Sequence, residues 1–404
     1  MTVGAARETA EAVARRSYGR LVALVTARTR DIAAAEDALA DAFAAALATW
    51  PERGVPDNPE AWLVVAARRA AGKRVRHGRV AEAGEAVLAL LQEERSEMET
   101  AATIPDDRLK LMFACAHPAI DPGVRTGLML QTVLGLDAVR IGVAFAEPAA
   151  TVGQRLVRAK AKIRDAGIPF RVPEAEDLPA RLGDVLDAIY VAYSTGWERA
   201  FADGEKDRGL SGEALWLGRL VTELLPAEPE PKGLLALMLY CEARRAARRD
   251  AAGRFVPLAA QDRDLWDEAL VIEAEGHLRR AAVAGRFGRF QTEAAIQSVQ
   301  VQAPRGQEAD PVPLVLLYDL LARFHPVLGV RVARAVAHAR RDGPEAGLRL
   351  LDEVAAEAAS YQPSWAARLA LARAAGRIAE AEAARERAAA LSPDPAVADW
   401  LRTR

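Results

Sequence analysis

Cysteine, histidine and aromatic residues are scarce in this chain of 404 residues, which has two cysteines, five histidines and 5% aromatic residues. Cys115 and Cys241 lie in different segments, which argues against a disulfide framework and against a paired-cysteine metal site. We interpret both as small buried residues. Because the histidines show no metal-ligand spacing, we expect no metal and no other cofactor.

Long apolar runs and catalytic motifs are also missing. The longest apolar run, residues 233–241, is far too short to cross a bilayer, and the N-terminus has no apolar signal core. We therefore expect a cytoplasmic protein that does not bind a membrane. The sequence has no nucleophile elbow, phosphate-binding loop, dinucleotide glycine pattern or paired-carboxylate site, so we do not expect an enzyme.

Convincing β-strand patterns are absent too, because alanine-rich segments dominate and period-two alternation is not evident. The chain is 51% hydrophobic and 27% charged, which is ordinary for a folded protein. These features predict an all-α fold. The length is enough for roughly two to four domains.

One segment stands out by its charge. Residues 151–164 hold five basic residues and no acidic one, although the whole chain has a formal charge of only -2. At helical spacing one narrow face is apolar and the neighbouring face carries the polar side chains Thr151, Gln154, Arg155, Arg158 and Lys162. A short helical pattern, residues 137–145, and a tight turn precede it, which is the layout of a helix-turn-helix.

This layout admits two interpretations. A helix with Thr, Gln and Arg on its first turns can enter the major groove of DNA and hydrogen-bond base edges. A basic amphipathic helix can equally be a solvated surface. Spacing alone does not decide between them.

The N-terminal segment, residues 1–80, carries two further charged helical patterns. Residues 31–43 place Asp31, Glu36, Asp37 and Asp41 along the polar side of an amphipathic helix. A proline-rich loop follows, and Asn58 before Pro59 predicts the start of the next helix. Residues 61–80 contain six basic residues and no acid, which predicts a second basic helix.

The remaining chain divides by composition. Residues 81–104 are rich in glutamate and predict an acidic linker between two anion-binding modules. Residues 105–170 predict a compact helical domain, with a helix that starts at Asp121 and ends at Gly135 before the helix-turn-helix. Residues 171–310 predict a helical domain, and residues 311–404 contain two similar segments, offset by 33 residues, that predict tetratricopeptide-like repeats.

A set of motifs resembles a known family. Residues 34–43, 50–51, 58–63 and 67–68 resemble region 2 of an extracytoplasmic-function (ECF) sigma factor of the sigma-70 family. Residues 107–113, 115–118 and 154–160 are similar to region 4 of one subgroup. Members of that subgroup continue into a long C-terminal helical extension with tetratricopeptide-like repeats, and residues 217–220, 233–239 and 261–263 match that extension.

The resemblance implies a sigma factor that binds RNA polymerase core and directs promoter-specific transcription initiation. It implies core binding through Asp31, Glu36, Asp37 and Asp41. It implies contact with the promoter -10 element through Trp62, Arg68, Arg69, Lys73 and Arg76. It implies contact with the promoter -35 element through Thr151, Gln154, Arg155, Arg158 and Lys162.

The sequence departs from the family at several of these positions. Arg69 and Lys73 stand where the family usually has Asn and Asp, and Ala149 and Ala150 replace a usual Glu-Pro pair. The extra positive charge raises sequence-independent DNA affinity.

We expect the C-terminal domain to regulate the sigma factor or to bind a protein partner through its repeats. Two alternatives stay open: a helix-turn-helix DNA-binding regulator that acts without polymerase, and a repeat scaffold with degenerate DNA-binding helices.

Overall fold

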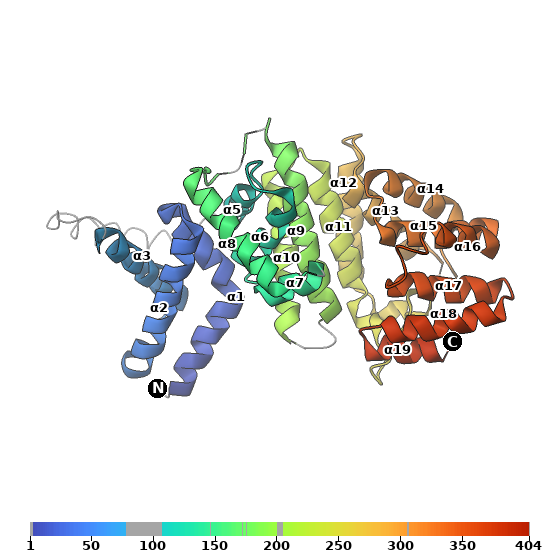
Figure 1. Ribbon diagram of the computed structural model, residues 1–404, viewed down its shortest axis with the longest axis horizontal. Coiled ribbons are helices and arrows are strands. Elements are labelled where there is room, and N and C mark those ends of the chain that lie inside the picture. Colours follow the sequence, from blue (N-terminus) through green and yellow to red (C-terminus); the bar gives the residue numbers. More distant parts are fainter. Residues whose placement is uncertain are drawn as a thin grey trace. The chain divides into compact units, whose positions relative to one another are not determined.

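The computed structural model describes residues 3–77, 107–145, 147–171, 173–174, 176–199, 205–304 and 307–403. These residues form helices and connecting turns, with one isolated β-bridge between Arg249 and Phe255 and no strand (Figure 1). The predicted all-α fold is confirmed. The predicted acidic linker, residues 81–104, lies outside the described residues. Within the described residues no helix is both long enough and apolar enough to cross a membrane.

The chain divides into two compact units, Met1–Leu217 and Gly218–Arg404. Helix α10 runs across the division. The helices of the first unit, in chain order, are α1 (Val3–Thr29), α2 (Ile32–Arg53), α3 (Pro59–His77), α5 (Arg108–Cys115), α6 (Pro122–Thr132), α7 (Ala138–Phe145), α8 (Ala149–Asp165), α9 (Leu178–Arg199) and α10 (Glu205–Leu224). The predicted domain boundaries at residues 80, 104, 170 and 310 stay predictions.

Local capping interactions explain where several of these helices begin. The side chains of Asn58, Asp121 and Asp137 each accept a hydrogen bond from a backbone N–H in the first turn that follows. Such caps satisfy donors that have no partner inside the helix. The predicted helix starts at Asn58 and Asp121 are therefore confirmed. The helix that starts at Asp121 also ends as predicted, since Gly135 has a φ of 67° and the Leu136 N–H bonds back to the carbonyl of Leu130.

Helices α1, α2 and α3 pack against one another around a core of aliphatic and aromatic side chains. The largest fully buried members of this core are Leu21, Ile32, Leu39, Trp50 and Leu63. Trp62 at the start of α3 meets Trp50 edge-to-face, with ring centroids 5.5 Å apart.

The helices α5 to α8 form a second cluster in this unit. Cys115, Leu128 and Met129 are fully buried within it, and burial raises the pKa of the Cys115 thiol to about 12. Helix α9 packs against α5 and α6, and Arg125 pairs with Asp184 at 2.8 Å. The predicted burial of Cys115 is confirmed, whereas Cys241 is only partly buried, beside Arg244.

The second unit continues with helices that pack mostly against their sequence neighbours. They are α11 (Pro229–Ala243), the 3-10 turns η2 (Arg245–Arg248), η3 (Leu258–Ala260) and η4 (Arg263–Leu265), then α12 (Glu268–Ala282), α13 (Arg289–Gln302), α14 (Pro311–Phe324), α15 (Leu328–Asp342), α16 (Pro344–Asp352), α17 (Gln362–Ala374), α18 (Ile378–Leu391) and α19 (Pro395–Arg402).

A half-buried carboxylate joins three of these helices. Glu275 on α12 accepts hydrogen bonds from Tyr240 on α11 at 2.6 Å and from Ser298 and Gln302 on α13 at 2.6 and 3.1 Å. Although burial opposes its charge, these donors hold the pKa of Glu275 below its usual value. The network fixes the register of α11, α12 and α13.

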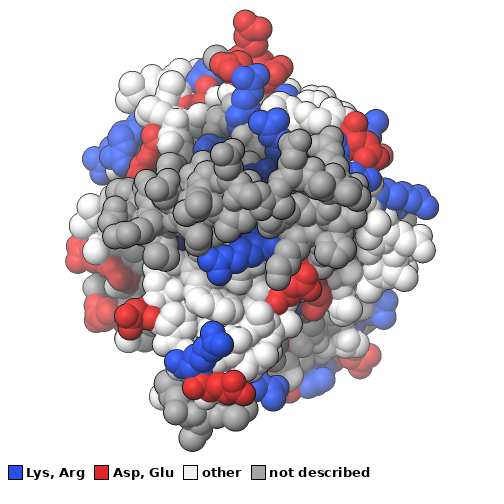
Figure 2. Space-filling model, turned by 90° about the vertical axis from the view of Figure 1, so that its left-hand side faces the viewer, with Lys and Arg blue, Asp and Glu red and all other residues white. Residues whose placement is uncertain are grey.

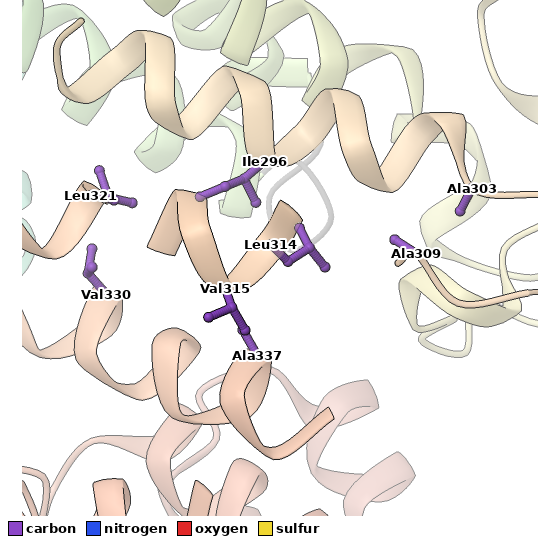
Figure 3. Packing of buried hydrophobic residues seen from close by; sticks show 8 residues of the cluster. All are labelled: Ile296, Ala303, Ala309, Leu314, Val315, Leu321, Val330 and Ala337. Carbon is purple, nitrogen blue, oxygen red and sulfur yellow. The ribbon is translucent and has the colours of Figure 1, made fainter. Parts of the chain in front are cut away.

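Helices α13, α14 and α15 share an apolar core, which Figure 3 shows from close by. Its eight buried residues are Ile296, Ala303, Ala309, Leu314, Val315, Leu321, Val330 and Ala337. Farther along the chain, Gly343 lies between the packed helices α15 and α16, and Gly376 lies between the packed helices α17 and α18. Both glycines have a positive φ, of 93° and 74°. These glycines lie in the two segments offset by 33 residues, so the helix pairs α15–α16 and α17–α18 are related as the sequence pattern indicates. Their assignment as tetratricopeptide-like repeats stays a prediction.

Candidate functional site

Helix α8 presents the two faces that its sequence predicts. Val152, Leu156, Ala159 and Ile163 are buried against the rest of the unit. The predicted DNA-reading side chains Gln154, Arg155, Arg158 and Lys162 are exposed, and Thr151 is half-buried. The helix begins at Ala149, two residues before the predicted start, directly after Pro148. The first turns of α8 are therefore accessible to a ligand.

The basic side chains of this face line a cleft of about 570 Å³. Arg155, Arg158 and Lys162 line one wall. The other wall is lined by residues between α5 and α6 and at the start of α6, namely Ala119, Ile120, Asp121, Gly123 and Val124. Three cations on one wall of an open cleft attract a polyanion. Helix α7 packs beside α8, as a helix-turn-helix requires.

An ion pair at the turn before α8 involves one of the predicted DNA-reading residues. The Arg155 guanidinium donates hydrogen bonds to both carboxylate oxygens of Glu147, at 2.9 and 2.7 Å. Both side chains are partly exposed, at 47% and 35%. Glu147 therefore engages the Nη1 of Arg155 and offsets its charge at the start of α8. The sequence analysis did not assign Glu147 any role.

A second, more buried ion pair joins α8 to α2. The Lys160 ammonium lies 2.8 and 2.6 Å from the two carboxylate oxygens of Glu36, and its side chain is only 9% exposed. Arg164, one turn farther along α8, lies 3.9 Å from Asp31. Two of the four acidic residues predicted to bind polymerase therefore face the predicted DNA-reading helix. Lys160 was not predicted as a functional residue.

The acidic residues of α2 have different surroundings. Asp31 is the N-cap of α2, where its side chain accepts a hydrogen bond from the Ala34 N–H at 3.1 Å. Asp37 and Asp41 are exposed on the same helix, and Glu36 is half-buried between α2 and α8. The structure thus brings Asp31 and Glu36 together at α8 and leaves Asp37 and Asp41 on the surface.

The predicted -10 residues lie along α3. Trp62 is half-buried against Trp50, Arg68 is half-buried and Arg69 is exposed. Lys73 and Arg76 fall within α3, but their side chains lie outside the described part of the structure. Figure 2 shows the side of the molecule that lies at the left of Figure 1, where acidic and basic side chains are interspersed over the described surface.

No group of three or more His, Cys, Asp or Glu side chains in the described ranges is placed to hold a metal ion.

Comparisons with known proteins give two local matches and one that covers most of the chain. Residues 13–80 match Sigma-70 region 2, and residues 181–282 match a family of unknown function (DUF6596). An uncharacterized protein of Rhizobium meliloti (strain 1021) is 36% identical over 378 residues, which cover 92% of this chain and 89% of the relative. No solved structure matches the chain.

Proposed function

Because this chain belongs to the same family as the Rhizobium meliloti protein and contains a sigma-70 region 2, we propose that it is an ECF sigma factor, which binds RNA polymerase core and directs promoter-specific initiation in the cytoplasm. The match of residues 13–80 carries this proposal. It covers α1 from residue 13 onward and the whole of α2 and α3, with the acidic face of α2 and the basic residues of α3.

In this proposal the acidic side of α2 binds core polymerase. Glu36, Asp37 and Asp41 are spaced on one side of the helix, and Asp31 caps its N-terminus. A surface of this charge binds a basic partner surface and speeds the encounter with it. Helix α3 then binds the -10 element through Trp62, Arg68 and Arg69, with Lys73 and Arg76 as further cations of the same helix.

Helix α8 reads the -35 element. Thr151 and Gln154 lie on its first turns, where side chains reach base edges, and Arg158 and Lys162 follow where phosphates pass. The cleft beside them supports this assignment because its cationic wall coincides with the polar face predicted from the sequence. Gly218–Arg404 would then be a fused regulatory domain, whose repeat-like helices bind a protein partner.

The test uses the full-length protein with purified core polymerase. We expect co-elution with core, and a specific run-off transcript from promoters identified by mapping start sites after overexpression. The double variant Arg155→Ala/Arg158→Ala should lose -35 recognition and keep core binding. Equal promoter binding by the variant would show that α8 is not the reader.

The two alternatives give different results in the same experiments. A helix-turn-helix regulator that acts without polymerase would bind DNA but fail to co-elute with core. A repeat scaffold with degenerate DNA-binding helices would lack the steep loss of DNA affinity with salt that several phosphate contacts impose. Either result would overturn the sigma-factor proposal.

A further inference from the structure

The second unit contains a cavity whose lining has unused hydrogen-bonding groups. The cavity has a volume of about 340 Å³ and is lined by the turns η3 and η4, the C-terminal end of α13 and the segment that leads into α14. Its volume is at the lower end of the range of small-molecule sites, roughly 300–1,000 Å³. Residues 261–263, one of the sequence motifs noted above in the C-terminal extension, form part of the wall.

Arg263 fixes the shape of this wall. Its guanidinium donates hydrogen bonds to the backbone carbonyls of Gln300, Val301 and Ala303, where α13 ends. Carbonyls at a helix end have no partner within the helix, and a cation there also interacts favourably with the negative end of the helix dipole. The guanidinium carbon lies 4.9 Å from the centre of the Trp266 ring. Arg263 is thus engaged by the protein itself and positions Trp266 at the cavity.

Two buried polar atoms at this cavity have no hydrogen-bond partner among the described residues. They are the indole Nε1 of Trp266 and the side-chain oxygen Oε1 of Gln261. The Gln261 carboxamide is oriented by its nitrogen, which donates to the carbonyl of Val256 at 3.4 Å. An indole N–H only donates and a carboxamide oxygen only accepts. Because buried polar groups are normally paired in native proteins, one donor and one acceptor are available here to a ligand.

The charged side chains at the cavity already have partners. Arg340 on α15 donates to Glu308 at 2.6 Å, and the Asp262 carboxylate accepts from the Asp264 N–H at 3.0 Å, as the cap of η4. A charged ligand must displace one of these interactions or lose its hydration without a counter-charge, whereas an uncharged ligand needs neither. The Glu308 side chain is 69% exposed, so an anion is the competitor that a test must include.

Apolar groups complete the lining and suit the body of a small ligand. Ala303 and Ala309 belong both to the cavity wall and to the core that α13, α14 and α15 share, and Figure 3 shows them at one edge of that core. Leu258 on η3 adds a larger apolar side chain. We propose that this cavity binds a small uncharged amide, whose carbonyl oxygen accepts from the Trp266 indole and whose N–H donates to the Gln261 oxygen. The site is independent of the proposed sigma-factor function.

The test compares matched pairs of small amides on the full-length protein by calorimetric titration. Uracil and pyrrolidone each offer an amide carbonyl and an N–H. Dimethyluracil, methylated on both ring nitrogens, and N-methylpyrrolidone keep the ring and the carbonyl but have no N–H. We expect the N–H amides to bind, and their methylated partners to bind roughly 5- to 150-fold more weakly, because the buried Gln261 oxygen then stays unpaired. Orotate, the anionic counterpart of uracil, should bind more weakly than uracil.

Two variants remove the two polar atoms separately. Trp266→Phe keeps an aromatic ring beside Arg263 but has no N–H, so it should weaken both members of each pair. Gln261→Met keeps the length of the side chain but has no acceptor, so the preference for the N–H amide should disappear. Trp365→Phe is the control and should change nothing, because the Trp365 indole already donates to the carbonyl of Ala359 at 3.1 Å and does not line the cavity.

The position of the ligand is read from the indole N–H resonances of the isotope-labelled protein. The resonance of Trp266 is identified by its loss in Trp266→Phe. A bound N–H amide should move the proton resonance of Trp266 downfield, the direction of hydrogen-bond formation, and leave that of Trp365 in place.

Three results would overturn the amide site. If no N–H amide at millimolar concentration moves the Trp266 resonance, the two polar atoms bind water only. If the methylated amides bind as tightly as their N–H partners, Gln261 does not accept from the ligand. If orotate binds more tightly than uracil, the cavity is an anion site. The comparison of paired ligands needs only the unmodified protein, so it decides even where a variant fails to fold.

Discussion

The ion pair between Glu147 and Arg155 predicts that neutralising one carboxylate will strengthen DNA binding. In Glu147→Gln the Arg155 guanidinium is no longer held by two short hydrogen bonds and is available to a phosphate or a base. The removed carboxylate also stops repelling the DNA backbone. Both effects raise the affinity for DNA.

The size of the effect follows from the exposure of the pair. Because the two side chains are 47% and 35% exposed, solvent screens the interaction, and such pairs are worth about 0.2–1 kcal/mol. Release of Arg155 therefore strengthens DNA binding by roughly 1.5- to 5-fold. A larger gain would mean that the lost repulsion between the Glu147 carboxylate and the DNA backbone contributes as well.

The measurement is fluorescence anisotropy of a labelled duplex at several potassium chloride concentrations, with four proteins: unmodified, Glu147→Gln, Arg155→Ala and the double variant. Arg155→Ala should cost more affinity in the Glu147→Gln background than alone, by the part of the gain that comes from the release of Arg155. Glu174→Gln is the control, since Glu174 forms an exposed pair with Arg171 far along the chain from this turn. Equal losses in both backgrounds would refute the idea that Glu147 restrains Arg155.

Two further predictions concern the core around α8. Leu156→Ala should lower the free energy of unfolding by about 2–5 kcal/mol in a urea titration, because Leu156 is 2% exposed, whereas Val157→Ala, at 68% exposure, should change it by less than about 0.5 kcal/mol. Similar losses for these two neighbours would show that the buried face of α8 is wrongly assigned. Since the pKa of the Cys115 thiol is raised from 9.0 to about 12, the folded state keeps a proton that the unfolded state loses, and the free energy of unfolding should fall as the pH rises from about 9 to about 12. Between these pH values Cys115→Ala should remove that part of the pH dependence. Identical curves of unfolding free energy against pH for the variant and the unmodified protein would contradict the prediction.

Local sequence rules predicted those features of the fold that depend on neighbours in the chain. The helix starts at Asn58 and Asp121 and the turn at Gly135 were predicted because caps and left-handed glycines act within a few residues. The buried and exposed faces of α8 were predicted because the helical period alone sets them. Such rules could not predict contacts between residues that are far apart in the sequence.

Lys160 shows why part of the candidate site could not be predicted. Its partner Glu36 is 124 positions away in the sequence, and a helical pattern does not indicate which distant segment will cover it. On a helical wheel Lys160 is one more cation on a basic helix. In the structure it is buried, while Lys162 two positions later stays exposed. Only the packing of α8 on α2 distinguishes the buried, ion-paired Lys160 from the exposed Lys162.

The opposite charges of α2 and α8 give these two helices a physical reason to pack against each other. Each helix is the nearest partner of opposite charge for the other, and modules joined in one chain meet at effective concentrations in the millimolar range. Ion pairs too weak to join separate proteins are then populated, and the pairs of Glu36 with Lys160 and of Asp31 with Arg164 are of this kind. Mutual neutralisation also lowers the affinity of the free protein for non-specific DNA, because a cation paired with a carboxylate releases no counterions from a phosphate. We therefore expect DNA binding to depend more steeply on salt in a Lys160→Met variant than in the unmodified protein, because the loss of the ion pair with Glu36 leaves more of the cations of α8 to pair with phosphates. An equal salt dependence in the two proteins would contradict this competition.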